Sequence, residues 1–234
     1  MYSHDRVSTE IAAHGVYEAD SLEVLLQLLL RHDEALSTLD VVIDVGAHVG
    51  NHALFFSQYA RRVVAFEPNP TLFKLLCLNV GDSDIVEPVQ LAVSHRAGTA
   101  VLVGTVENLG GASIIANGET STFESSVEVT SLDESEHLFQ SGRISLIKCD
   151  VEGAEPNVIR GAASLIQKHR PTLVAEFPGD RDLRSRILAA VEDLECGYTR
   201  VWWPHNFRSR DSWFRGMWLG KRISLRSSRD FSEV

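Results

Sequence analysis

Two patterns of hydrophobic and polar positions alternate along this chain. Short, largely apolar runs such as 41–45, 62–66 and 144–149 are separated by segments whose apolar residues recur at helical spacing. Such apolar runs are typical of parallel strands covered on both faces, and their alternation with helices is typical of an α/β protein. The pattern therefore predicts a mostly parallel β-sheet flanked by helices.

The same pattern predicts the order of the elements in a single domain, because no repeat, low-complexity tract or linker divides the chain. We expect strands at residues 41–45, 62–66, 86–93, 98–103, 127–129, 144–149 and 172–177, with a closing antiparallel pair at 198–203 and 217–225. We expect helices at residues 21–30, 51–60, 69–79, 132–134, 156–169 and 182–195. Residues 108–126, rich in Gly, Ser, Thr and Asn, are expected to form a long loop.

The composition is that of a folded domain, and the net charge limits the classes of partner that we expect it to bind. Of the 234 residues, 44% are hydrophobic, which excludes general disorder. A formal net charge of -10 argues against a nucleic-acid-binding protein, because phosphate binding needs a concentrated positive field. Residues 200–234 hold eight Lys and Arg against three Asp and Glu. This basic segment could attract an anion, although a solvated tail explains it as well.

Several features predict a cytoplasmic location. The apolar stretch 22–30 is too short for a membrane span, which needs about 20 residues. The first ten residues are polar and do not resemble a secretory signal. Cys77, Cys149 and Cys196 are widely separated in apolar surroundings, so we expect buried thiols and neither disulfides nor a zinc site.

A glycine-containing segment at 44–51 follows the first predicted strand. Gly46 permits a tight turn, and Gly50 allows the next helix to pack near the strand. The spacing matches neither the dinucleotide-binding nor the phosphate-binding glycine loop, so a ligand with an amino-acid part is favoured over a pyrophosphate. Asp44 could attract its ammonium group, and backbone N–H groups could hold its carboxylate. The alternative is a glycine turn with a structural role alone.

Glu67 ends the second predicted strand, 23 residues beyond Asp44. A carboxylate at this place in an α/β fold can accept hydrogen bonds from both hydroxyls of a ribose. The glycine segment and Glu67 together predict a nucleoside-containing ligand.

Three segments together resemble FkbM-type methyltransferases: residues 44–51, 65–70 and 147–155. The likeness extends from about Gly15 to Phe177, and it departs mildly at His48, where the family commonly has Asn. The resemblance implies an S-adenosylmethionine-dependent O-methyltransferase with a Rossmann-like class I fold and a mostly parallel seven-stranded sheet. The single domain, 1–234, would comprise an N-terminal helical cap at 1–40, a cofactor-binding core at 41–177, and a C-terminal helix with closing strands at 178–234.

The resemblance also implies where the cofactor binds. Asp44, Gly46 and Gly50 would face its methionine half and Glu67 its ribose. Asn69 would lie near the adenosine, and Ala92, at the end of the third strand, would contact the adenine. The complete set of expected cofactor-binding residues is Asp44, Gly46, Ala47, His48, Gly50, Asn51, Glu67, Asn69, Ala92 and Asp150.

The acceptor side is expected at the ends of two neighbouring strands. Asp150 ends the strand at 144–149, where it could orient the acceptor hydroxyl, take its proton or bind a divalent metal. Glu176, near the end of the next strand, would lie roughly 5 Å away, so Asp150 and Glu176 together could hold Mg²⁺. Glu152 and Glu155 follow at a helix start, where carboxylates are also favoured for purely structural reasons.

Histidines and aromatic residues supply further candidates. His48 and His52 could face the ligand, and Trp203 beside His205 suits stacking on a sugar face, although core or dimer packing explains the tryptophans as well. The expected catalytic residues are Asp150, Glu152, Glu176 and His205. The expected substrate-binding residues are Tyr17, Glu18, Glu155, Trp203 and His205.

The sequence therefore predicts methyl transfer to a hydroxyl of a sugar, glycan or glycosylated natural product. The expected partner is a small molecule or oligosaccharide, with a homodimer conceivable through 22–30 or the tryptophans. A nicotinamide-dependent oxidoreductase is disfavoured by the glycine spacing, and methylation of nucleic-acid bases by the net charge. A non-catalytic binding domain on the same fold is the remaining alternative.

Overall fold

The computed structural model describes most of the region that carries these motifs. The described residues are 11, 16–19, 22–23, 25–27, 38–105, 108–113, 123–139, 142–176, 181–198, 200–202 and 216–220.

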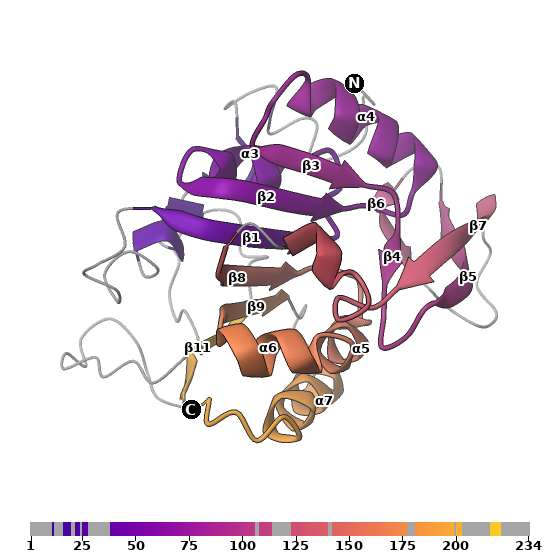
Figure 1. Ribbon diagram of the computed structural model, residues 1–234. Helices are drawn as coiled ribbons and strands as arrows, with labels where there is room; N and C mark the ends of the chain where they lie inside the picture. The colour runs from indigo at the N-terminus through magenta and orange to yellow at the C-terminus, as the bar shows by residue number, and fades with distance from the viewer. Residues whose placement is uncertain are drawn as a thin grey trace.

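A seven-stranded sheet forms the centre of the fold, in the order β10-β11-β9-β8-β1-β2-β3 (Figure 1). Its strands are β1 (Leu39–Val45), β2 (Ala60–Phe66), β3 (Val86–Val89), β8 (Ile144–Cys149), β9 (Thr172–Glu176), β10 (Arg200–Trp202) and β11 (Gly216–Gly220). Strands β9, β8, β1, β2 and β3 are parallel, whereas β11 pairs antiparallel with both β9 and β10. The predicted mostly parallel sheet and its closing antiparallel pair are confirmed.

Helices cover both faces of this sheet (Figure 1). They are α3 (Asn51–Ser57), α4 (Pro70–Val80), α5 (Glu155–Arg160), α6 (Ala163–His169) and α7 (Arg181–Glu192). Alternate residues of β1 point to opposite faces, so Ile43 packs with α5, α6 and α7, and Val42 packs with α3 and α4. The carboxyl ends of the parallel strands are left as the place where loops can form a site.

The N-terminal segment belongs to the core. Helical residues occur at 11, 19, 22–23 and 25–27, and Leu22, Leu25 and Leu26 are buried. These three leucines therefore pack inside the chain, whereas residues 28–30 of the suggested dimer surface lie outside the described residues.

A second sheet lies beyond the carboxyl ends of β1, β2 and β3 (Figure 1). Its strands are β4 (Ala92–Val93), β5 (Gly98–Thr105), β6 (Asn108–Ser113) and β7 (Phe123–Thr130), in the order β4-β7-β5-β6. The predicted strand at 86–93 was wrong because it is two strands, β3 and β4, in different sheets. The predicted loop at 108–126 was wrong at 108–113 and 123–126, where antiparallel pairing with β5 turns Gly- and Ser-rich backbone into strands. Residues 114–122 lie outside the described residues.

Some local predictions also need correction. The expected helix at 156–169 is broken between α5 and α6, where a Cβ on Gly161 would lie 2.0 Å from the backbone oxygen of Ser94. The short helix expected to begin at 132–134 starts as a turn at 132–135 and continues as a 3-10 helix at Glu136–Phe139. Cys149 and Cys196 are buried as expected, but Cys77 is exposed. Among the described residues, no helix has the length and apolar character that a membrane span requires.

Candidate active site

The loop from Gly46 to Gly50 is a tight turn, as predicted. Gly46 has φ 80°, and a Cβ there would lie 1.9 Å from the backbone oxygen of Asp150, so only glycine fits between β1 and β8. The backbone nitrogens of Gly46 and Ala47 both donate to the carbonyl oxygen of Phe66, at 3.0 and 2.9 Å. The loop is thereby fixed to the carboxyl ends of β2 and β8.

Gly50 has a different neighbour from the one expected. It precedes α3 with φ 89°, and a Cβ there would lie 2.6 Å from Leu76 Cδ1 on α4. Gly50 therefore allows close packing between two helices and not between a helix and a strand.

Glu67 joins the glycine loop to the loop after β2. Its Oε2 accepts a hydrogen bond from His48 N at 2.9 Å, and its Oε1 accepts one from Asn69 N at 2.8 Å. Burial raises the pKa of Glu67 to about 7, although both backbone hydrogen bonds oppose the shift. Each carboxylate oxygen has a second acceptor site, which is available for the hydroxyls of a bound nucleoside.

The side chain of Asn69 caps the N-terminus of α4. Its Oδ1 accepts hydrogen bonds from Thr71 N and Leu72 N, at 2.9 and 3.4 Å, which caps the helix. Its buried Nδ2 has no hydrogen-bond partner among the described residues. A bound ligand would supply the acceptor that this donor needs.

Ala92 does not occupy the expected position. It begins β4 and pairs with β7 in the second sheet, and is not at the end of β3. Ala92 is buried, so any adenine contact from this region has to be made close to the junction of the two sheets.

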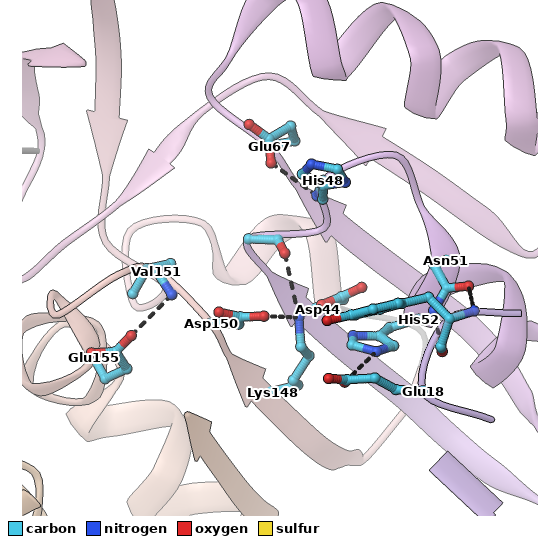
Figure 2. Close-up of polar contacts among 12 residues, drawn as sticks. Glu18, Asp44, His48, Asn51, His52, Glu67, Lys148, Asp150, Val151 and Glu155 are labelled. Atoms are coloured by element: carbon cyan, nitrogen blue, oxygen red, sulfur yellow. Dashed lines mark hydrogen bonds and ion pairs between the residues drawn. The ribbon is translucent and has the colours of Figure 1, made fainter. Parts of the chain in front are cut away.

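Lys148 is a functional candidate that the sequence reasoning missed. Its Nζ lies 3.0 Å from Asp44 Oδ1 and 3.5 Å from Asp150 Oδ2, and it donates to Gly46 O at 3.3 Å (Figure 2). The side chains of Lys148 and Asp44 are 6% and 0% exposed. Burial alone would lower the pKa of Lys148, but the Asp44 and Asp150 carboxylates hold it above its ordinary value. A lysine inside the apolar strand at 144–149 was the available signal.

Lys148 changes the interpretation of Asp44. The ammonium of Lys148 occupies Oδ1, whereas Oδ2 has no hydrogen-bond partner among the described residues. Asp44 therefore both anchors Lys148 and retains one free acceptor oxygen for a second cation.

Asp150 and Glu176 come together at the ends of β8 and β9, as predicted, and their side chains are hydrogen-bonded. Burial, followed by the charge of Asp150, raises the pKa of Glu176 to about 10. Burial would also raise the pKa of Asp150, but Lys148 and the hydrogen bond with Glu176 hold it below its usual value. At neutral pH, Glu176 is protonated and donates to an ionised Asp150.

The described residues give no support to the Mg²⁺ site that the sequence suggested at this pair. Within the described part of the chain, no group of three or more His, Cys, Asp and Glu side chains is arranged to hold a metal ion. Asp150 already faces the ammonium of Lys148 and the proton of Glu176, and both compete with a cation. The arrangement is better suited to holding a proton than a metal.

Glu152 and Glu155 shape the loop that follows Asp150. Glu152 is exposed and has φ 51° in a turn with Gly153 at φ 100°. Glu155 is 1% exposed, and its Oε1 accepts from Val151 N and Gly153 N at 3.0 and 3.2 Å. This burial favours a structural role for Glu155 over the expected substrate contact.

The N-terminal segment reaches the site through the first turn of α3. Tyr17 N donates to Asn51 Oδ1, and Asn51 Nδ2 donates to Tyr17 O, both at 2.9 Å. His52 Nε2 lies 3.6 Å from Glu18 Oε2. The side chain of Asn51, expected to bind cofactor, is thus engaged with Tyr17. Trp203 and His205 lie outside the described residues.

These features define a class of protein. A parallel sheet with a glycine turn after its first strand and an acid after its second is the Rossmann-like arrangement of proteins that bind nucleotides or nucleosides. The family model for the methyltransferase FkbM domain matches residues 44–199. The chain therefore belongs to the FkbM methyltransferase family, and it is a methyltransferase and not a nicotinamide-dependent oxidoreductase.

The chain is also similar to individual proteins that are named as methyltransferases. The chain is 24% identical over 202 residues to methyltransferase sdnD of Sordaria araneosa, covering 71% of this chain and 78% of that protein. It is 34% identical over 149 residues to the hexuronic acid methyltransferase AglP of Haloferax volcanii, covering 61% and 57%. The crystal structure of methyltransferase FkbM from Methylobacillus flagellatus KT has the same fold, with a TM-score of 0.54 and 16% identity, covering 77% of this chain and 43% of that one.

Proposed function

We propose that this protein transfers a methyl group from S-adenosylmethionine to a hydroxyl oxygen of a sugar, glycan or glycosylated natural product. The observation that carries the proposal is the position of Asp150. It is held ionised between Lys148 and protonated Glu176, and its backbone contacts the glycine turn where the cofactor would bind. The family supports methyl transfer, and the similarity to the hexuronic acid methyltransferase AglP supports a sugar-type acceptor.

The cofactor would bind along the carboxyl ends of β1 and β2. The Oδ2 of Asp44, which has no hydrogen-bond partner among the described residues, would pair with its ammonium group. Glu67 would accept hydrogen bonds from the ribose hydroxyls, and Asn69 Nδ2 would donate to the adenosine.

The reaction is a single in-line displacement. As the acceptor oxygen forms a bond to the methyl carbon, the carbon–sulfur bond breaks and its electron pair remains on sulfur. The hydroxyl proton then passes to Asp150. A low pKa does not prevent this step, because an ether oxygen that still carries its proton is a strong acid. The chief contribution of the protein is alignment of the two reacting atoms.

The acceptor would be bound beside Asp150 by Glu152, Tyr17 and Glu18. Trp203 and His205 are proposed to stack on the sugar face. The three free cysteines, Cys77, Cys149 and Cys196, are compatible with the cytoplasmic location that we propose.

Two measurements test the proposed function. Calorimetric titration should detect binding of S-adenosylhomocysteine and no binding of NAD. Methyl transfer from labelled S-adenosylmethionine should then occur with a member of a panel of glycosides, and EDTA should leave the rate unchanged. Loss of activity in EDTA and recovery on addition of Mg²⁺ would instead favour a metal at Asp150 and Glu176. Absence of S-adenosylhomocysteine binding would contradict the proposal.

A further inference from the structure

Two adjacent residues of α3 hold the N-terminal segment against the active site. The amide of Asn51 makes two hydrogen bonds to the backbone of Tyr17, 34 residues earlier in the chain. The imidazole of His52 pairs with the carboxylate of Glu18, and these side chains are 10% and 9% exposed. The consecutive residues Asn51 and His52 thus contact the consecutive residues Tyr17 and Glu18.

Glu18 has an unusual backbone conformation. Its φ of 57° lies in the left-handed region, which is unfavourable for a residue with a Cβ. The carbonyl oxygen of Glu18 accepts a hydrogen bond from Leu22 N at 3.1 Å, and Leu22 is buried in the core. Contacts on both sides of Glu18 therefore impose the conformation, as is common where a side chain has to point into a functional site.

The pair of Glu18 and His52 faces the acceptor-side carboxyl groups. Glu18 and His52 lie close enough to Glu176 and Asp150, respectively, to interact with them electrostatically. Figure 2 shows Glu18 and His52 on the side of Asp44 that faces away from Glu67. Glu18 is therefore remote from the proposed ribose site and close to the proposed acceptor site.

We infer that Glu18 binds the acceptor and that Asn51 and His52 are positioning residues that hold Glu18 in place. This inference rests on the proposed function. The carboxylates of Glu18 and Asp150, together with the neutral carboxyl group of Glu176, would form three sides of the acceptor site. The two carboxylates accept hydrogen bonds from hydroxyl groups and repel anions, so this site favours an acceptor with neighbouring uncharged hydroxyls. The preferred sugar ring would then carry no carboxylate of its own.

Matched acceptors test this specificity. The panel should contain pairs that differ only at one carbon, such as methyl glucoside and methyl glucuronide, and the corresponding galactosides. The wild-type protein should prefer the neutral member of a pair. Glu18→Gln should raise the KM for that acceptor about tenfold, because one hydrogen bond to a charged group is lost. Its affinity for S-adenosylhomocysteine should remain within about twofold of wild type, because Glu18 lies away from that ligand.

Glu18→Gln should also reduce the preference for the neutral acceptor of each pair, because the substitution removes a negative charge that repels the carboxylate of the other acceptor. Preference of the wild-type protein for the glucuronide, or a Glu18→Gln variant with unchanged KM, would overturn the inference. Glu23→Gln is the matched control, since it makes the same chemical change at an exposed position of the same segment.

Hydrogen exchange tests the positioning role without an acceptor. In the wild-type protein the amides of Tyr17 and Leu22 should be protected. Asn51→Leu and His52→Phe should speed their exchange, and both should raise the acceptor KM more than they lower kcat. His52→Gln, which keeps a donor toward Glu18, should recover most of the effect. Unchanged exchange in Asn51→Leu would overturn the positioning role. If the wild-type protein methylates no hydroxyl, the proposed function fails, whereas the exchange result still decides what Asn51 and His52 do.

Discussion

The ammonium of Lys148 lies 3.0 Å from a carboxylate oxygen of Asp44, and both side chains are buried between the central strands β1 and β8. Removing one member of such a pair leaves an uncompensated charge in the protein interior. The pair therefore connects the stability of the sheet to the electrostatics of the site.

Lys148→Met should destabilise the protein by about 3–5 kcal/mol, because the buried carboxyl group of Asp44 would lose its ion-pair partner. Urea unfolding followed by circular dichroism measures this change. The double variant Asp44→Asn with Lys148→Met should recover a large part of the loss. Equal stability of the single and double variants would contradict the prediction.

Gly46→Ala should prevent normal closure of the glycine loop, because its Cβ would lie 1.9 Å from the backbone of Asp150. Binding of S-adenosylhomocysteine should be lost, and the melting temperature should fall sharply. Gly81→Ala is the control, since Gly81 also has a positive φ, of 57°, but no atom within 4 Å of the added Cβ. The control should cost only about 1–2 kcal/mol. Similar losses in both variants would show that backbone conformation, and not the contact with Asp150, is decisive.

Glu67 should make cofactor binding depend on pH. Its pKa in the folded protein is raised from 4.5 to about 7, and ribose hydroxyls donate best to the ionised form. Below this pKa the ionised fraction falls about tenfold per pH unit, so affinity for S-adenosylhomocysteine should rise between pH 6 and pH 8. Calorimetric titration across this range measures the effect.

Glu67→Gln is the comparison for that pH dependence. The variant should bind about 1–3 kcal/mol more weakly at pH 8 and show little change with pH. In the unliganded protein, the contribution of Glu67 to folding stability should change in the opposite direction and fall as the pH rises. A raised pKa means that the contribution of Glu67 to stability is present below about pH 4.5 and is lost as the pH rises through about 7.

Asp150 and Glu176 should respond differently to amide substitution. Asp150→Asn should lower kcat by about 10²–10⁴-fold, because it removes the group that accepts the proton. Glu176→Gln should retain most of the activity, because Glu176 is already a neutral hydrogen-bond donor toward Asp150. Steady-state kinetics at saturating cofactor distinguishes them. If the two carboxyl groups held a metal, both variants would lose activity together.

The central sheet could be predicted because buried parallel strands leave a direct mark in the sequence. Strands β1, β2 and β8 are largely apolar runs, and their boundaries agree with the structure to within a few residues. The second sheet could not be predicted in the same way. Its β6 strand contains adjacent glycines, and only pairing with β5 makes it a strand. The close approach of Gly161 to the backbone of Ser94, which is distant in sequence, likewise leaves no local signal.

The residues of the candidate site also differ in whether the sequence could predict them. Glu67 and Asp150 could be located because each lies at the end of a recognisable strand. The role of Asn51 could not, because it depends on backbone contact with Tyr17 in a segment that carries few motifs. Lys148 was visible as a charge within an apolar run, but its two carboxylate partners become clear only when the strands are placed side by side.

Strand β11 lies inside the sheet, between β9 and β10, although it follows both of them in the chain. A ribosome therefore completes β9 about 40 residues before it supplies the strand that pairs with it. At ordinary rates of synthesis this interval lasts roughly 2–8 seconds, during which the outer edge of β9 has no partner. Unpaired edges of this kind recruit other chains. Production of this protein should accordingly depend on chaperone supply, and a version cut before residue 216 should collect in the insoluble fraction.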